Sequence, residues 1–258
     1  MKTIWVLHAK KLKQFVILFT ALLFTIGVIY VERENIPVFS SFSSGPQEPK
    51  AIYNVNTKNK QIALTFDISW GEERPGPILD ILEQNGLNHK VTFFLSSPWS
   101  QNHPEIVKRI VESGYEIGSH GHKHVNYSKL TDEEIETQIK KAHEILTQLT
   151  GQTPKLLRTP NGDFDTRVIK TANRLGYTVI QWDTDSRDWM NPGVNEIVKR
   201  VMNQVHPGDI ILMHASDSCK QTHEALPILI KQLKEKGYEF VTVSDLIASA
   251  KIDSSEIH

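Results

Sequence analysis

The sequence has little cysteine and no excess of either charge. Cys219 is the single cysteine in 258 residues, which excludes an intrachain disulfide and a cysteine-rich zinc site. The 29 Lys and Arg residues nearly balance the 30 Asp and Glu residues, for a formal net charge of -1. This balance gives no reason to expect a nucleic-acid partner. A chain of this length and ordinary apolar content can bury one sizeable core.

The amino-terminal part differs from the rest of the chain. Residues 15–31 form an uncharged apolar run, FVILFTALLFTIGVIYV, at the short end of the length that spans a membrane. No convincing small-residue cleavage site follows it, so we favour an uncleaved signal anchor over a cleaved signal peptide or a buried core helix. The basic cluster Lys10, Lys11 and Lys13 precedes it, which places residues 1–14 in the cytoplasm and the rest outside the cell.

A linker joins this segment to the main domain. Residues 32–50 end in SSFSSGPQEPK, which is rich in Ser, Pro and Gly and lacks periodicity. We therefore place the folded domain at residues 51–250 and a short tail at 251–258.

Strand-like and helix-like segments alternate through the domain. Short β-rich runs occur at residues 61–66, 91–95, 115–119, 155–158, 177–182, 209–213 and 238–243. Helical spacing separates nearly all of them: residues 104–113 begin with proline and stop before Gly114, and residues 131–150 begin with a capping box and stop before Gly151. Seven such strands fit a parallel β/α barrel or a doubly wound sheet, and the pattern does not choose between the two.

Residues capable of chemistry stand at the carboxyl ends of these predicted strands. They are Asp67, His120 with His124 just beyond it, Arg158, Asp183 with Asp185, and His214. In a β/α barrel such strand ends share one face, where the loops converge. The pattern therefore indicates an enzyme.

Each of these residues also has a structural interpretation. Asp67 follows an apolar run and would need a partner such as Arg158, so the two could form only a structural ion pair. A pair of histidines four residues apart can bind one divalent ion or simply lie on the surface, and His214 could be a satisfied core residue. If His214 is an acid, Asp183 or Asp185 could hydrogen-bond its ring and raise its pKa.

Taken together, the motifs resemble those of a known family. Thr-Phe-Asp at 65–67, His120-x-x-x-His124, Arg-Thr-Pro-Asn-Gly at 158–162, Asp-Ser-Arg-Asp-Trp at 185–189 and Leu-Met-His at 212–214 occur in the order of the five motifs of polysaccharide deacetylases with the NodB homology domain. The resemblance covers residues 51–248. The apolar segment and the stretch ALTFDISWGEE look most like the sporulation-associated PdaB-like branch.

The resemblance implies a deformed β/α barrel and a role for each motif residue. Asp67 would be the general base, held by Arg158, and His214 the general acid, tuned by Asp185. His120 and His124 would bind a divalent metal, zinc by analogy. The substrate-binding residues would be Pro160, Asn161, Trp189 and Leu212, with the backbone near Pro160 and Asn161 holding the oxyanion.

The chain departs from the family pattern at the metal site. The family usually has a second acid after Asp67 that completes the metal site, and this chain has Ile68. Isoleucine cannot bind a metal ion, so Asp67, a side chain such as Glu72, or water would have to fill the coordination sphere. Thr159 and Asn161 also replace residues usual in the family.

The resemblance implies hydrolysis of N-acetyl groups on cell-wall glycan, in particular peptidoglycan, by a single-pass cell-membrane protein whose domain lies on the extracytoplasmic side, including the forespore or spore envelope. Ile68 keeps a second class open, a pseudoenzyme that binds glycan without catalysis. Another amide or ester hydrolase on the same fold is a third alternative.

Overall fold

The structure is a computed structural model and describes residues 50–255. The predicted cytoplasmic segment 1–14, the apolar segment 15–31 and the linker up to residue 49 lie outside the described residues. Within residues 50–255, no helix has both the length and the apolar character needed to cross a membrane. The last helix, α9 (Val243–Ser255), runs past residue 250, where we had placed the end of the domain.

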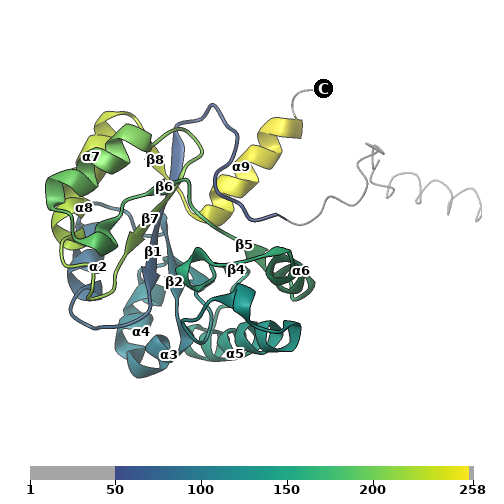
Figure 1. The fold of residues 1–258 in the computed structure, drawn as a ribbon. Coiled ribbons are helices and arrows are strands. Elements are labelled where there is room, and N and C mark those ends of the chain that lie inside the picture. Colours follow the sequence, from purple (N-terminus) through teal and green to yellow (C-terminus); the bar gives the residue numbers. More distant parts are fainter. Residues whose placement is uncertain (1–49, 256–258) are drawn as a thin grey trace, which may run out of the picture. The chain divides into compact units, whose positions relative to one another are not determined.

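Eight strands form one parallel sheet. They are β1 (Gln61–Ile68), β2 (Val91–Leu95), β3 (Glu116–Ser119), β4 (Leu156–Leu157), β5 (Thr178–Val179), β6 (Thr184–Asp185), β7 (Ile210–His214) and β8 (Glu239–Phe240). Their order is β5-β4-β3-β2-β1-β7-β6, with β8 paired to the start of β1. Seven strands on one path, curled and surrounded by helices, confirm the deformed β/α barrel (Figure 1).

The barrel is open between β5 and β6, for which no pairing is found in the described part of the chain. The segment just before β1 crosses this opening. Ile52 exchanges backbone hydrogen bonds with the β5 side, at Val179 O (2.9 Å) and Gln181 N (2.7 Å). Val55 N donates to Gly208 O (2.9 Å), two residues before β7 begins. Residues 52–55 therefore tie the two sides of the opening together.

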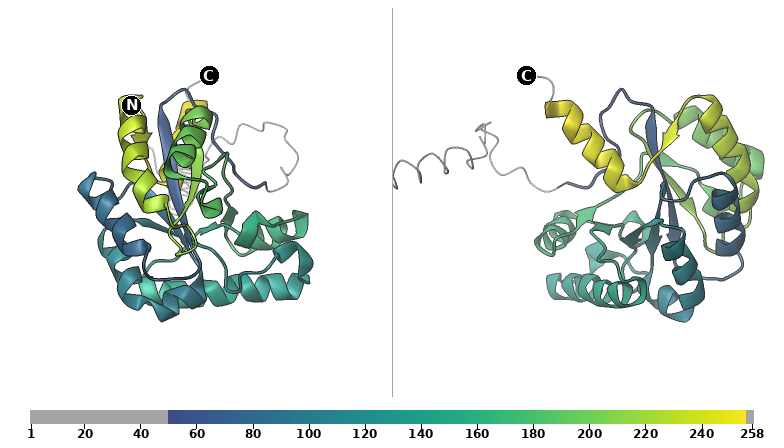
Figure 2. Two further views of the ribbon diagram at one scale, coloured as in Figure 1. Left: turned by 60° about the vertical axis from the view of Figure 1, so that its left-hand side comes forward. Right: turned by 180° about the vertical axis from the view of Figure 1, so that it is seen from behind.

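Helices surround the sheet in all three views (Figures 1 and 2). They are α2 (Pro75–Gln84), α3 (Ser97–Asn102), α4 (Pro104–Glu112), α5 (Asp132–Thr150), α6 (Thr166–Arg174), α7 (Val194–Gln204), α8 (Thr222–Glu235) and α9. The predicted start of α5 is confirmed: Thr131 Oγ1 accepts from Glu134 N, and the Glu134 carboxylate accepts from Thr131 N. Gly151 ends this helix in the left-handed conformation that glycine adopts without penalty (φ 68°).

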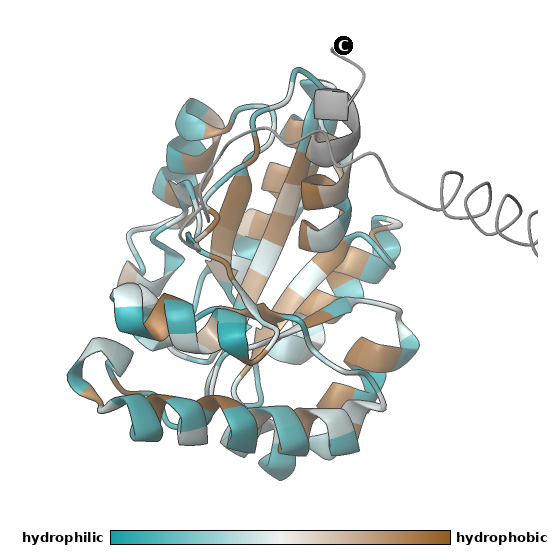
Figure 3. Ribbon diagram, turned by 90° about the vertical axis from the view of Figure 1, so that its right-hand side faces the viewer, coloured by the Kyte–Doolittle hydropathy of each residue, from teal (hydrophilic) through white to brown (hydrophobic). Residues whose placement is uncertain are grey.

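The core lies between the strands and the helices. The strands are predominantly hydrophobic, and the helices carry hydrophilic residues on their outward faces (Figure 3). Along β1 the side chains alternate: Leu64, Phe66 and Ile68 belong to the main apolar cluster, while Thr65 and Asp67 bind Arg158. This period of two places polar chemistry on one face of a buried strand.

Candidate active site

A cavity of about 640 Å³ opens where the loops after the strands meet. Adjacent strands supply two of its ionisable groups, because Asp67 of β1 and His214 of β7 are register partners. Partners in register point to the same face of a sheet. The lining residues are Asp67, Ser69, Trp70, His120, His124, Asn161, Gly162, Trp182, Asp185, Trp189, Leu212, His214, Ser216 and Ser218.

Asp67 is held as an anion at the floor of the cavity. Arg158 Nη1 donates to Asp67 Oδ1 (2.9 Å) and to Thr65 Oγ1 (2.8 Å), and Nη2 donates to Gln181 O (2.9 Å). The fully buried guanidinium lies over the Phe94 ring, 4.1 Å from its centroid. Burial alone would raise the pKa of Asp67, but the charges of Arg158 and the nearby histidines outweigh it and lower this pKa.

His120 is buried and oriented by the backbone. Its Nδ1–H donates to Arg158 O (2.8 Å), which leaves Nε2 as the free nitrogen, 3.8 Å from Asp67 Oδ2. Burial lowers the pKa of His120 to about 4, so the ring is neutral at physiological pH. His124 lies beside it, with ring centroids 5.5 Å apart, and burial also lowers the pKa of His124. His122, between them, bonds Ser97 Oγ instead.

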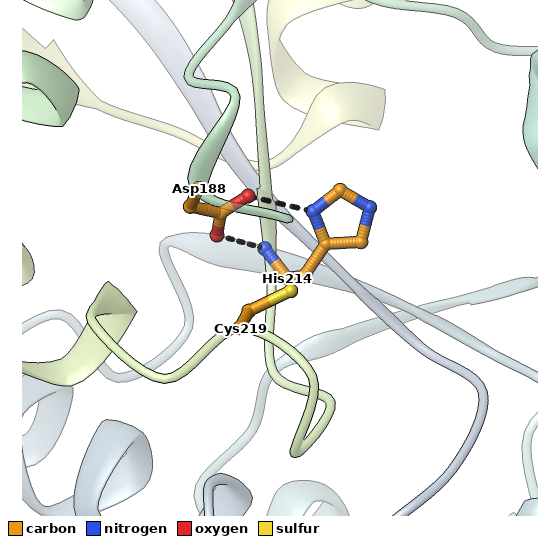
Figure 4. Close-up of side chains that lie close together, drawn as sticks. All are labelled: Asp188, His214 and Cys219. Carbon is orange, nitrogen blue, oxygen red and sulfur yellow. Dashed lines mark hydrogen bonds and ion pairs between the residues drawn. The ribbon is translucent and has the colours of Figure 1, made fainter. Parts of the chain in front are cut away.

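His214 is positioned by Asp188. The ring Nδ1 of His214 bonds Asp188 Oδ1 (2.8 Å), and its backbone N–H donates to Asp188 Oδ2 (2.8 Å), as Figure 4 shows. Thr222 Oγ1 also donates to Oδ2 (2.7 Å), so both oxygens of this fully buried carboxylate are engaged. Burial by itself would lower the pKa of His214, but the Asp188 charge and hydrogen bond outweigh it and raise this pKa.

The predicted hydrogen bond from Asp183 or Asp185 to the His214 ring was wrong, although the charge of Asp185 does contribute to the raised pKa of His214. Asp185 lines the cavity, but its Oδ1 accepts from the backbone N–H of Arg187 (2.8 Å). Asp183 lies elsewhere, where its Oδ2 bonds His206 Nε2 (2.9 Å). The chain turns after β6 through Arg187 in the left-handed conformation (φ 55°), and this turn brings the second acid of the motif to the ring.

Ile68 offers no ligand atom at the position of the family's second acid. Its side chain is fully buried in the main apolar cluster and does not line the cavity. Glu72 does not replace the missing acid, because its carboxylate lies 3.8 Å from His103 Nδ1 and is exposed.

A different trio has the tightest metal-like spacing among the described residues. The ligand atoms of Asp188, His214 and Cys219 all lie within 4.8 Å of one another (Figure 4). Burial raises the pKa of the Cys219 thiol to about 12, so it stays protonated. The Asp188 oxygens and His214 Nδ1 are already bonded to each other, and we therefore do not assign a metal to this trio.

The histidine pair has suitable chemistry for a divalent ion. His120 Nε2 and a nitrogen of His124 offer two neutral nitrogens, which zinc accepts as ligands. Asp67 Oδ2 lies 3.8 Å from His120 Nε2, but these three residues are not among the described groups whose ligand atoms all lie within 4.8 Å of one another. The hydrogen bond from Nδ1 of His120 to a backbone carbonyl is the usual support for a histidine ligand.

The predicted substrate-binding residues divide into two groups. Leu212, Trp189 and Asn161 line the cavity, whereas Pro160 does not. Arg158 likewise lies behind the cavity wall, where it holds Asp67. Trp70 also lines the cavity and is 58% exposed, and no motif in the sequence marks it as a site residue.

Comparison with known proteins agrees with this geometry. A family model described as polysaccharide deacetylase matches residues 54–180, which include Asp67, the histidine pair and Arg158. A peptidoglycan-N-acetylglucosamine deacetylase of Bacillus cereus is 36% identical over 198 residues, which cover 76% of this chain and 92% of that protein. The chain therefore belongs to the polysaccharide deacetylase family.

Other relatives differ in length or activity. The uncharacterized protein YlxY of Bacillus subtilis is 35% identical over 205 residues, and the chain spans 63% of its length. Among solved structures, BA3943 of Bacillus anthracis, a CE4 family pseudoenzyme, has a TM-score of 0.72 at 34% identity, covering 77% of this chain and 69% of that one. A mutant of BA3943 with restored enzymatic activity has the same TM-score.

Proposed function

We propose that this protein hydrolyses N-acetyl groups on cell-wall glycan, with peptidoglycan as the substrate. The observation that carries the proposal is the pairing of Asp67 and His214 in one cavity. Asp67 has a lowered pKa and is available as a base, and His214 has a raised pKa and is available as an acid. Amide hydrolysis needs both, one to activate water and one to protonate the leaving nitrogen.

In this mechanism Asp67 takes a proton from the attacking water. Arg158 keeps the carboxylate ionised and oriented through the 2.9 Å bond to Oδ1, which leaves Oδ2 for the water. His214 donates the proton on Nε2 to the leaving amine, because Nδ1 is committed to Asp188. The backbone near Asn161 holds the oxyanion, while Leu212 and Trp189 contact the acetyl methyl; all three residues line the cavity.

The metal proposed at this site is a divalent ion held by His120 and His124, with water in place of the missing acid, which leaves Asp67 Oδ2 free to act as the base. When bound, it would polarise the acetamide carbonyl and stabilise the negative charge that develops on its oxygen. With Ile68 in place of a second acid, we expect this ion to be held weakly.

The proposal for location follows from the sequence. We place the domain outside the cell on a single apolar anchor at residues 15–31, and in the forespore or spore envelope by likeness to the PdaB-like branch. Full-length protein recovered in the soluble fraction, or protein recovered without residues 15–31, would contradict this placement.

The second candidate is a pseudoenzyme that binds glycan, and Ile68 is the observation that favours it. BA3943, which is similar in sequence and fold, is a pseudoenzyme. The two candidates are separated by mass spectrometry of acetate released from defined peptidoglycan fragments and chitin oligomers, with and without added divalent metal. Acetate release supports the deacetylase and identifies its sugar; binding of the same glycans with no release supports the pseudoenzyme.

A further inference from the structure

Two exposed tryptophans stand on either side of the proposed acid. Trp70 is 58% exposed in the loop after β1, and Trp189 is 50% exposed in the loop after β6. The sheet order places β7, which ends at His214, between β1 and β6. Both indole side chains also line the cavity. Large apolar side chains left in water beside a polar site are typical of surfaces that bind a partner.

The loop that carries Trp70 is held rigidly by Asp217. This carboxylate accepts hydrogen bonds from the backbone N–H groups of Glu72 (2.9 Å to Oδ2) and Arg74 (2.9 Å to Oδ1). Gly71 approaches so closely that a Cβ there would lie 2.2 Å from Asp217 Cγ, and its φ is +87°. Gly71 O also accepts from Trp99 Nε1 (2.7 Å).

The loop that carries Trp189 is hydrogen-bonded to the same segment of the chain, the one that contains Asp217. Asn191 Nδ2 donates to Ser218 O (2.9 Å), and Asn191 Oδ1 accepts from Lys220 N (2.7 Å). Residues 216–220, which begin two residues after His214, therefore hold both tryptophan loops. The aromatic surfaces are fixed relative to the proposed acid before any ligand arrives, which reduces the entropy cost of binding.

We propose that Trp70 is a stacking platform for a sugar ring next to the one that is deacetylated, and that Asp217 positions it. This inference rests on the proposed function and names its substrate more closely: a β-linked oligomer of N-acetylated sugars rather than a single sugar. Indole faces suit this role because the C–H faces of a pyranose ring pack against a large apolar surface. Trp70 would make the protein prefer longer sugar oligomers over single sugars. Asp217 would contribute only by holding the loop that carries Trp70.

The test is isothermal titration of the full chain with the tetramer and the monomer of N-acetylglucosamine. We expect wild type to bind the tetramer more tightly, and Trp70→Ala to weaken tetramer binding about tenfold while leaving the monomer unchanged. Trp70→Phe should recover part of the loss. Tyr53→Ala is the matched control, since Tyr53 is 45% exposed but does not line the cavity, and it should bind as wild type does.

Asp217→Ala tests the positioning role. It should weaken tetramer binding as Trp70→Ala does, and the double variant should bind no worse than the weaker single variant, because both changes remove one platform. Additive losses would overturn the role of Asp217. Equal tetramer affinity in wild type and Trp70→Ala, or no preference of wild type for the tetramer, would overturn the platform.

Acetate release measured on the same samples separates this inference from the proposed reaction. Loss of tetramer binding in Trp70→Ala, with no acetate from wild type, supports the platform and contradicts the deacetylase. If both proposals hold, Trp70→Ala should raise KM for the tetramer and leave kcat nearly unchanged.

Discussion

At the scale of single residues, the site depends on two hydrogen-bonded pairs with opposite effects. Arg158 keeps Asp67 ionised, and Asp188 keeps the His214 ring protonated at higher pH than a free histidine. The reaction needs both states together. Activity should therefore rise as pH passes the lowered pKa of Asp67 and fall as pH passes the raised pKa of His214.

Asp188→Asn should move the upper limb of this profile. Removal of the negative charge beside the ring lowers the pKa of His214, so activity is lost at lower pH, by about 1–2 pH units. The measurement is kcat/KM for acetate release against pH. Asp185→Asn is the matched control, because Asp185 makes no hydrogen bond to the ring and is the smallest of the influences on its pKa. Equal shifts in the two variants would refute the assignment of Asp188.

Ile68→Asp should make stability depend on metal. A carboxylate placed in the apolar cluster is unpaired, and we expect a loss of roughly 2–4 kcal/mol in the free energy of unfolding without metal. Zinc should restore part of the loss, because the family resemblance places a metal-binding acid at this position, and an ion at the histidine pair would draw the new carboxylate out of the apolar cluster. Thermal unfolding with and without zinc measures this.

Ile68→Asn is the control for that experiment, since it has similar size and polarity without the charge. It should be destabilised in both conditions. The same response to zinc in the two variants would show that residue 68 does not reach the histidine pair.

Most of the site residues were predictable from sequence, and their pairing was only partly so. The predicted pair Asp67 and Arg158 is confirmed as a hydrogen-bonded ion pair. The partner of His214 was not predictable, because Asp185 and Asp188 stand three residues apart and the left-handed turn at Arg187 decides which one reaches the ring. Spacing alone does not encode that turn.

At the scale of elements, the least regular part of the barrel is the opening between β5 and β6. Residues 52–55 bridge it, and Gly208 allows their close approach, since a Cβ there would lie 1.9 Å from Val55 O. Each of the seven segments predicted to be strands contains one in the structure. The sequence pattern did not predict β6, and it predicted a longer strand at β5 than the structure has. Two-residue strands carry no periodicity, and tertiary pairing alone defines them.

Gly208→Ala should destabilise the protein by more than its backbone conformation alone requires. The φ of +81° costs about 1–3 kcal/mol for alanine, and the contact with Val55 adds to it. Gly176→Ala is the matched control: its φ is +80°, and no heavy atom lies within 4 Å of the added Cβ. Denaturant unfolding should show a larger loss for Gly208→Ala, and equal losses would mean that the bridge contributes nothing at this point.

At the scale of the whole molecule, the barrel brings residues from distant parts of the chain to one cavity. Asp67 and His214 are neighbours only because β1 and β7 pair in parallel, far apart in sequence. The position of these residues at the carboxyl ends of predicted strands predicted that they would meet in one site, since parallel strands end on one face of the barrel. The tryptophan loops and their shared support at 216–220 were not predictable, because they depend on loop contacts that no sequence period records.

The central claim is that the cavity hydrolyses an N-acetyl group with His214 as the acid. The most direct measurement is the rate of acetate release from defined peptidoglycan fragments by wild type and by His214→Ala, with folding of both verified by circular dichroism. We predict release by wild type and a rate roughly 100 to 10,000 times lower for His214→Ala. Equal rates in the two proteins, or no release by a folded, glycan-binding wild type with metal added, would contradict the account.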